Sequence, residues 1–214
     1  MPLSPPALRR HIHTRTVTCE GYRRQDGLWD IEGHITDRKT YSYTTEERGE
    51  VKTGEPVHEM WIRLTVDDRL TVTAVEAVTD NSPFPQVCPH IAPNYQRVVG
   101  LTIGRGWTRA LKERLGGVQG CTHLLELLGP IATTAYQTIM PILGREEAAR
   151  RQATGETAPK DYPLLNSCHA FRADGPVVAR YAPHLYTGND PLPESSGPLA
   201  DPNSTAGRRL LFGG

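Results

Sequence analysis

Alternation of apolar and polar residues predicts antiparallel strands in the first half of the chain. In one segment Trp29, Ile31 and Ile35 are apolar and the intervening residues are mostly polar, which is typical of a half-buried strand. Short turn signals, such as the Gln-Asp-Gly at 25–27, separate neighbouring segments and favour hairpins. The predicted strands are residues 10–24, 28–36, 57–66 and 70–78.

Helical spacing replaces this alternation later in the chain. Short helices are predicted near residues 94–99 and 107–115, and a main buried helix over 121–140, kinked at Gly129-Pro130. Residues 145–152 read as a separate solvated helical turn. We interpret 37–56 as a charged loop and 164–181 as two short strands around a turn at 173–176. The expected fold class is therefore α+β, with antiparallel β-hairpins packed against a few helices.

Domain organisation follows from length and local composition. A chain of 214 residues can form one core with appendages. We expect a disordered lead-in at 1–8 and one α+β domain over 9–186. Residues 187–214 are rich in proline, glycine and serine, which predicts a disordered tail.

Charge and hydropathy narrow the range of partners. The chain has 24 basic and 24 acidic residues and a pI near 7.1, so no electrostatic feature favours nucleic acid or an anionic membrane. It has no apolar stretch long enough to span a bilayer and no signal-peptide pattern at its start. We therefore expect a cytoplasmic protein, in which the four cysteines are thiols or metal ligands rather than disulfides.

Cysteine and histidine lie close together three times in the sequence, as Cys88-Pro-His, Cys121-Thr-His123 and Cys168-His. Thiolate and imidazole are the usual ligands of zinc and iron, although this spacing matches no known zinc motif. One hypothesis is a zinc or iron site formed by residues His58, Cys88, Cys121 and His123, because the start of the third strand and the loop after the fourth can converge on the helix that begins at Cys121. A purely structural role for these cysteines stays open.

Acidic residues and histidines of the first predicted hairpin form a second candidate site. Glu32 and His34 share one face of their strand, and His13 lies on the strand before it. A carboxylate beside an imidazole can act as a general base, and Tyr22 and Arg23 could donate hydrogen bonds to a developing negative charge. An ordinary solvent-facing sheet surface is the alternative.

Several longer motifs resemble those of a known protein family. Within residues 9–181 the chain resembles a bacterial family of unknown function, domain-of-unknown-function family 2889. The resemblance is carried by four runs: TVTCEGYRRQDGLWDIEGHITDRKTY, GEPVHEMWIRLTVDD, VCPHIAP and GGVQGCTHLLELLGP. The resemblance implies a role in the catabolism of aromatic compounds. It further implies a carbon–carbon lyase that releases formaldehyde from lignin-derived phenolic compounds. Such an enzyme would take a small aromatic substrate and no cofactor, with Glu32, His34, His13, Tyr22 and Arg23 as its catalytic residues; a homodimer is left open.

A second resemblance is to the NifU/IscU-type iron–sulfur scaffold proteins. The segment from His58 to the helix at Cys121 resembles their arrangement of a hairpin, a cysteine loop and a long helix. In this comparison His58 or Glu59 stands in place of the first ligand cysteine, and Cys88 lies near the second. This resemblance implies a NifU/IscU-like fold and, as the alternative function, a metal-binding or iron–sulfur accessory protein. A non-catalytic partner of a larger catabolic enzyme is a third hypothesis.

Overall fold

The computed structural model describes residues 4–156 and 163–189. The chain divides into two compact units with the boundary between Ala153 and Thr154, and each is described here by itself. The predicted single domain over 9–186 spans both units and stays a prediction. Residues 1–3 of the predicted lead-in and residues 190–214 of the predicted tail lie outside the described residues.

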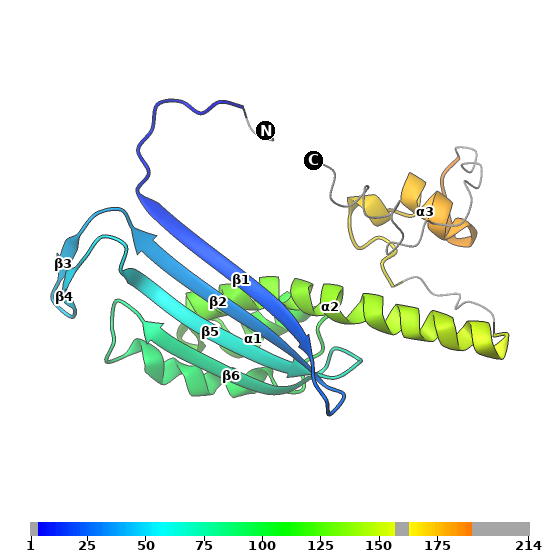
Figure 1. Ribbon diagram of the computed structural model, residues 1–214, viewed down its shortest axis with the longest axis horizontal. Coiled ribbons are helices and arrows are strands. Elements are labelled where there is room, and N and C mark those ends of the chain that lie inside the picture. The colour runs from blue at the N-terminus through cyan, green and yellow to red at the C-terminus, as the bar shows by residue number, and fades with distance from the viewer. Residues whose placement is uncertain (1–3, 157–162, 190–214) are drawn as a thin grey trace. The chain divides into compact units, whose positions relative to one another are not determined.

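The first unit is built on a four-stranded antiparallel sheet (Figure 1). Its strands are β1 (His13–Arg23), β2 (Trp29–Lys39), β5 (Pro56–Val66) and β6 (Val72–Asn81), in the order β1-β2-β5-β6. All four predicted strands are present. Gly27 in the β1–β2 turn has a φ of 86°, a conformation that only glycine adopts without cost.

A small second hairpin lies between β2 and β5, where a loop over 37–56 was predicted. It consists of β3 (Tyr43–Thr45) and β4 (Gly49–Val51). The Thr45 hydroxyl accepts a hydrogen bond from the Arg48 backbone N–H, which closes the turn. The loop prediction was therefore wrong for this segment, because local turn chemistry orders a stretch that has few apolar residues.

One face of the sheet, called the inner face here, is covered by the helices (Figure 1). The longest is α2 (Thr122–Thr154), and Gly33 of β2 lets it approach closely, since a Cβ there would lie 2.5 Å from the Ile131 Cδ1 atom. Alternate strand residues point into the resulting core, as their spacing predicted. The fully buried ones on β2 and β5 are Trp29, Ile31, Ile35, Met60, Ile62, Leu64 and Val66.

The helix α2 is longer than predicted. It continues through Pro130 and Pro141 to Thr154, and so includes the segment 145–152 that was interpreted as a separate turn. Ion pairs between residues one turn apart, such as Arg150 with Glu147 at 2.8 Å, stabilise this polar end. The prediction of a helix ending at residue 140 was wrong because the charged segment has no apolar stripe by which to recognise it.

Three shorter helical segments complete the first unit. The helix α1 (Trp107–Leu115) agrees with its predicted bounds. The 3₁₀ helix η1 (Cys88–Val98) follows β6 and includes the predicted helix near 94–99, and η2 (Gly117–Gln119) leads to the start of α2. These segments bring the chain from the sheet edge to the first turn of α2.

The second unit is helical in its described part. It contains η3 (His169–Phe171), α3 (Pro176–Tyr181) and η4 (Pro183–Leu185). The predicted pair of strands over 164–181 was wrong, because Pro176 takes the first helical position, where its missing N–H is not needed. The α+β class is confirmed, and none of the described helices is both long and apolar enough to cross a membrane.

Candidate active site

A buried carboxylate near the end of β2 is the centre of the candidate site. The Asp37 side chain is 1% exposed and accepts hydrogen bonds from both neighbouring strands. Arg15 donates from Nε and Nη2, each at 2.8 Å, and His13 Nε2 lies at 2.9 Å. On the other side His58 Nδ1 lies at 3.0 Å. The strand register explains the cluster, because Asp37 is paired directly with Arg15 on β1 and with His58 on β5.

The charge of Asp37 is held by these partners. Burial alone would raise the pKa of its carboxyl group, but the hydrogen bonds from Arg15 and His13 outweigh burial and lower the pKa to about 2. The carboxylate is therefore ionised at neutral pH. An ionised carboxylate can only accept hydrogen bonds, so the proton between it and His58 belongs to the imidazole Nδ1.

A second histidine lies against the first, with its ring tilted by 30°. His123, in the first turn of α2, has its ring centroid 3.8 Å from that of His58, and its Nε2 lies 3.9 Å from Asp37 Oδ2. Burial lowers the pKa of both histidines; the neighbouring His123 lowers that of His58 further, and Arg15 lowers that of His123. Both rings are therefore neutral at pH 7. A neutral His58 with its proton on Nδ1 has an unprotonated Nε2 that can accept a proton.

A thiol lies beside the histidine pair. Cys121 immediately precedes α2, and its Sγ lies 3.8 Å from His123 Nδ1 and 4.0 Å from Met60 Sδ. Tyr95 of η1 fixes the cysteine backbone: its hydroxyl donates to the Cys121 carbonyl at 3.0 Å and accepts from the Cys121 N–H at 3.1 Å. Burial raises the pKa of Tyr95, so this hydroxyl keeps its proton.

His58, Cys121 and His123 line one wall of a cavity of about 580 Å³, together with Met60. The remaining wall is largely apolar, with Phe84, Val87 and Ile91 in the segment between β6 and the middle of η1. Phe84 and Val87 are 51% and 67% exposed, so the apolar side reaches solvent. The cavity is lined by His58, Met60, Pro83, Phe84, Val87, Cys88, His90, Ile91, Gly120, Cys121, Thr122 and His123.

All four candidate metal ligands of the sequence analysis line this cavity: His58, Cys88, Cys121 and His123. The closest-spaced ligand group among the described residues is a different set, Asp37 with His58 and His123, whose ligand atoms lie within 4.8 Å of one another. Both carboxylate oxygens of Asp37 accept hydrogen bonds from the Arg15 guanidinium. A cation bound there would face that positive charge, so the set fits a metal ion poorly.

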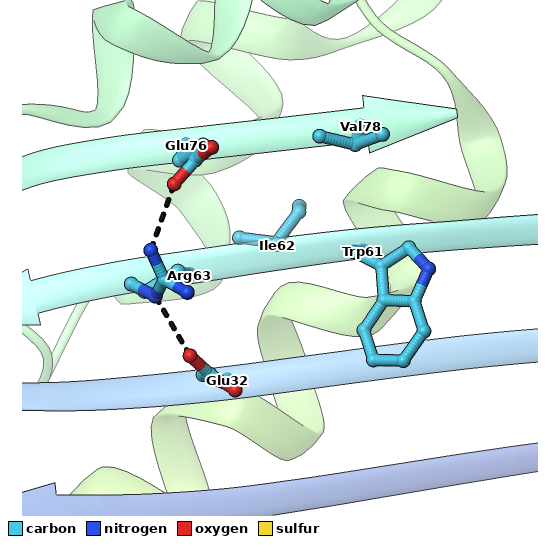
Figure 2. A pocket seen from close by; sticks show the side chains of 6 residues that line it. All are labelled: Glu32, Trp61, Ile62, Arg63, Glu76 and Val78. Atoms are coloured by element: carbon cyan, nitrogen blue, oxygen red, sulfur yellow. Dashed lines mark hydrogen bonds and ion pairs between the residues drawn. The ribbon is translucent and has the colours of Figure 1, made fainter. Parts of the chain in front are cut away.

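The acid–base candidates of the first hairpin are spread over both faces of the sheet. Glu32, His34 and Tyr22 lie on the outer face, opposite the helices. Figure 2 shows Arg63 between Glu32 and Glu76, donating to them at 2.7 and 2.8 Å. The hollow beside these residues is small, about 200 Å³.

His34 and Tyr22 also have outer-face partners. His34 stacks on Trp61 with ring centroids 3.5 Å apart, and its Nε2 lies 3.4 Å from Glu59 Oε1. The Tyr22 hydroxyl donates to Glu20 at 2.8 Å. Imidazole and carboxylate therefore meet here as well, with 25% and 22% of the His34 and Glu59 side chains exposed, but on the face opposite the larger cavity.

The other two candidates lie on the inner face. Arg23 donates to Glu146 of α2 at 2.6 Å and lies over the Trp29 ring, whereas His13 contacts Asp37. The five residues therefore do not form one cluster. Asp37 and Arg15 were not predicted as site residues, although a signal was present: a strand extended by one residue beyond Thr36 places Asp37 on the buried side with Ile31 and Ile35.

A family model described as "Protein of unknown function (DUF2889)" matches residues 13–137. The match includes the sheet, the cavity and the first half of α2, and it stops short of the second unit. The chain has no significant match among curated proteins or among solved structures. The expected similarity to NifU/IscU-type scaffold proteins is therefore not supported.

Proposed function

The chain belongs to the DUF2889 family, whose description assigns no activity, and we propose that it is an enzyme whose histidine pair performs acid–base chemistry in the apolar cavity. The observation that carries the proposal is the contact between His58 Nδ1 and the buried Asp37 carboxylate at 3.0 Å. A carboxylate that holds one imidazole nitrogen leaves the other free to accept a proton.

The lining of the cavity supports a substrate with an apolar body. Phe84, Val87 and Ile91 offer contact surface to a planar ring, and polar groups are concentrated on the opposite wall. A volume of about 580 Å³ accommodates a molecule larger than a single ring. A small aromatic compound with one or two hydroxyl groups matches this division between apolar and polar walls.

The specific reaction that we propose is a carbon–carbon cleavage that releases formaldehyde from a lignin-derived phenolic compound. His58 Nε2 would take the proton of a primary hydroxyl group. The bond between the hydroxymethyl carbon and its neighbour then breaks, and its electron pair moves into a conjugated acceptor on the aromatic body. Formaldehyde leaves, and the proton returns to the product from the imidazole. No redox cofactor is needed, and the thiols beside the site suit the reducing cytoplasm.

Substitution of His58 tests this proposal. With His58→Gln, formaldehyde release from a hydroxymethyl-bearing phenolic dimer should fall by about 10²- to 10⁴-fold, the usual contribution of a general base. A fluorogenic assay for formaldehyde measures the rate, and circular dichroism verifies folding. The matched control is His34→Gln on the outer face, which should leave the rate unchanged. If His34→Gln abolishes release and His58→Gln does not, the site lies on the outer face.

A metal-binding or iron–sulfur accessory protein is the competing hypothesis. It is favoured by the presence of His58, Cys88, Cys121 and His123 around one cavity, and disfavoured by the guanidinium of Arg15 beside Asp37. Elemental analysis of the purified protein separates the two hypotheses. About one zinc or iron per chain, lost in a Cys88→Ser, Cys121→Ser double variant, would support the accessory protein and contradict the proposed enzyme.

A further inference from the structure

Cys121 has the surroundings of a nucleophile rather than of a packing residue. Its Sγ lies 3.8 Å from His123 Nδ1, and the other nitrogen of that ring lies 3.9 Å from the buried Asp37 carboxylate. Thiol, imidazole and carboxylate thus follow one another in the order found in cysteine nucleophile sites, where the base takes the thiol proton and the acid orients the base. The thiol also lines the cavity, so a ligand in the cavity can reach it.

Two further features fix the thiol in place. The Tyr95 hydroxyl is hydrogen-bonded to both the N–H and the C=O of Cys121, which ties the backbone at the thiol to η1. Cys121 also directly precedes the 33-residue helix α2, whose first-turn N–H groups stabilise negative charge nearby. The cavity offers a comparison within the same molecule, because Cys88 lines it too, and within the described residues its thiol has no hydrogen bond to a histidine like that of Cys121 to His123.

We propose that Cys121 is a nucleophilic thiol, assisted by His123, that adds reversibly to the carbonyl carbon of an aldehyde bound in the cavity. The Sγ–H proton passes to His123 Nδ1 while the S–C bond forms, and the C=O π pair becomes an alkoxide. The imidazolium then returns the proton to that oxygen, giving a hemithioacetal. No atom is lost and nothing is oxidised or reduced. The aldehyde class rests on the proposed function, whose product is formaldehyde released beside this thiol.

Selective alkylation tests the inference without any turnover assay. The full-length protein is treated with iodoacetamide at pH 7, and the modified fraction of each cysteine is followed by peptide mass spectrometry. We expect Cys121 to react at least about tenfold faster than Cys88. Benzaldehyde, chosen because its ring fits the apolar wall, should slow alkylation of Cys121, and dilution of the aldehyde should restore the rate.

The variant His123→Gln identifies the assisting group. It should slow alkylation of Cys121 by about tenfold and leave Cys88 unchanged, because Cys121 is the thiol that lies 3.8 Å from the Nδ1 atom of that ring. Equal rates for Cys121 and Cys88 in the unaltered protein would overturn the inference, whatever the folding of the variant. So would a failure of benzaldehyde to protect Cys121.

The two proposals can fail separately. An unreactive Cys121 in a protein that releases formaldehyde would remove the covalent adduct and leave the acid–base lyase intact. A reactive, benzaldehyde-protected Cys121 in a protein that releases no formaldehyde from phenolic dimers would support the nucleophile and contradict the lyase.

Discussion

The two faces of the same sheet hold similar residues in opposite circumstances. On the outer face, His34 approaches Glu59, and Arg63 bridges Glu32 and Glu76 beside a hollow of about 200 Å³. On the inner face, Asp37 is 1% exposed and binds Arg15 and two histidines beside a cavity of about 580 Å³. Histidine, arginine and carboxylate are present in both regions.

Environment, not residue type, separates the two regions. Water solvates the Arg63 ion pairs of the outer face, since Arg63 and Glu76 are 45% and 65% exposed, so each pair contributes little. On the inner face, burial removes that solvation, and the strands must supply every partner of the carboxylate. The result is a fixed tautomer of His58 and lowered pKa values of His58 and His123. A fixed, neutral imidazole beside an apolar cavity is suited to catalysis, whereas the outer network is suited to a solvated surface.

Removal of the buried carboxylate should give the largest effect. Asp37→Ala removes the buried acceptor shared by Arg15 and two histidines and leaves Arg15 with its exposed partner Glu126, so we expect a loss of about 3 kcal/mol in the free energy of unfolding. Urea denaturation measures the loss. The matched control is Glu32→Ala, which removes a partner of the exposed Arg63 and should cost less than about 1 kcal/mol. Similar losses in the two variants would mean that the inner and outer carboxylates are equivalent.

Acid titration should separate the same two regions. The folded-state pKa of Asp37 is about 2, below its ordinary value of 3.8, so its contribution is complete above pH 3.8 and is lost as pH falls through 2. The shift corresponds to about 2 kcal/mol. In unfolding measurements between pH 2 and 4, Asp37→Asn should show a shallower fall of stability with decreasing pH than the unaltered protein. An unchanged slope would show that Asp37 is not held ionised.

Loss of a single hydroxyl at Tyr95 should have a smaller effect. Tyr95→Phe keeps the ring in the core but removes the acceptor of the Cys121 N–H and one of the two donors to the Cys121 C=O, so we expect a cost of about 1 to 2 kcal/mol. Thermal unfolding measures this cost. Val118→Ala is the control, because that side chain is 90% exposed and its truncation should be close to neutral. If both variants unfold like the original protein, the hydroxyl does not hold the start of α2.

Strand positions and faces could be predicted because alternation is a local signal. The buried parity of Trp29, Ile31 and Ile35 and the four strands of the main sheet follow from it directly. The meeting of Cys88 and Cys121 around one cavity could be anticipated from the ends of neighbouring elements. The second hairpin and the full length of α2 could not, since their segments lack an apolar pattern.

The centre of the site was missed because it depends on register. Antiparallel pairing of β1 with β2 sets odd-numbered residues opposite odd-numbered ones, so His13 shares a face with Asp37 and not with Glu32 or His34. Alternation gives each strand two faces but does not say which faces of neighbouring strands coincide. Asp37 was also assigned to a loop, so its three partners had no predicted common neighbour.

The smallest predicted effect concerns the ion pairs of Arg63 on the outer face. Arg63→Met removes both bridges, to Glu32 and Glu76, but keeps most of the apolar stem. Because the three side chains are 45%, 33% and 65% exposed, the loss should be below about 1 kcal/mol. It should shrink further in high salt, which screens exposed charges. Urea denaturation at low and high salt measures both values. If the free energy of unfolding falls by several kcal/mol and the loss persists in high salt, the outer face is covered in solution and its charges are buried, as the charge of Asp37 is.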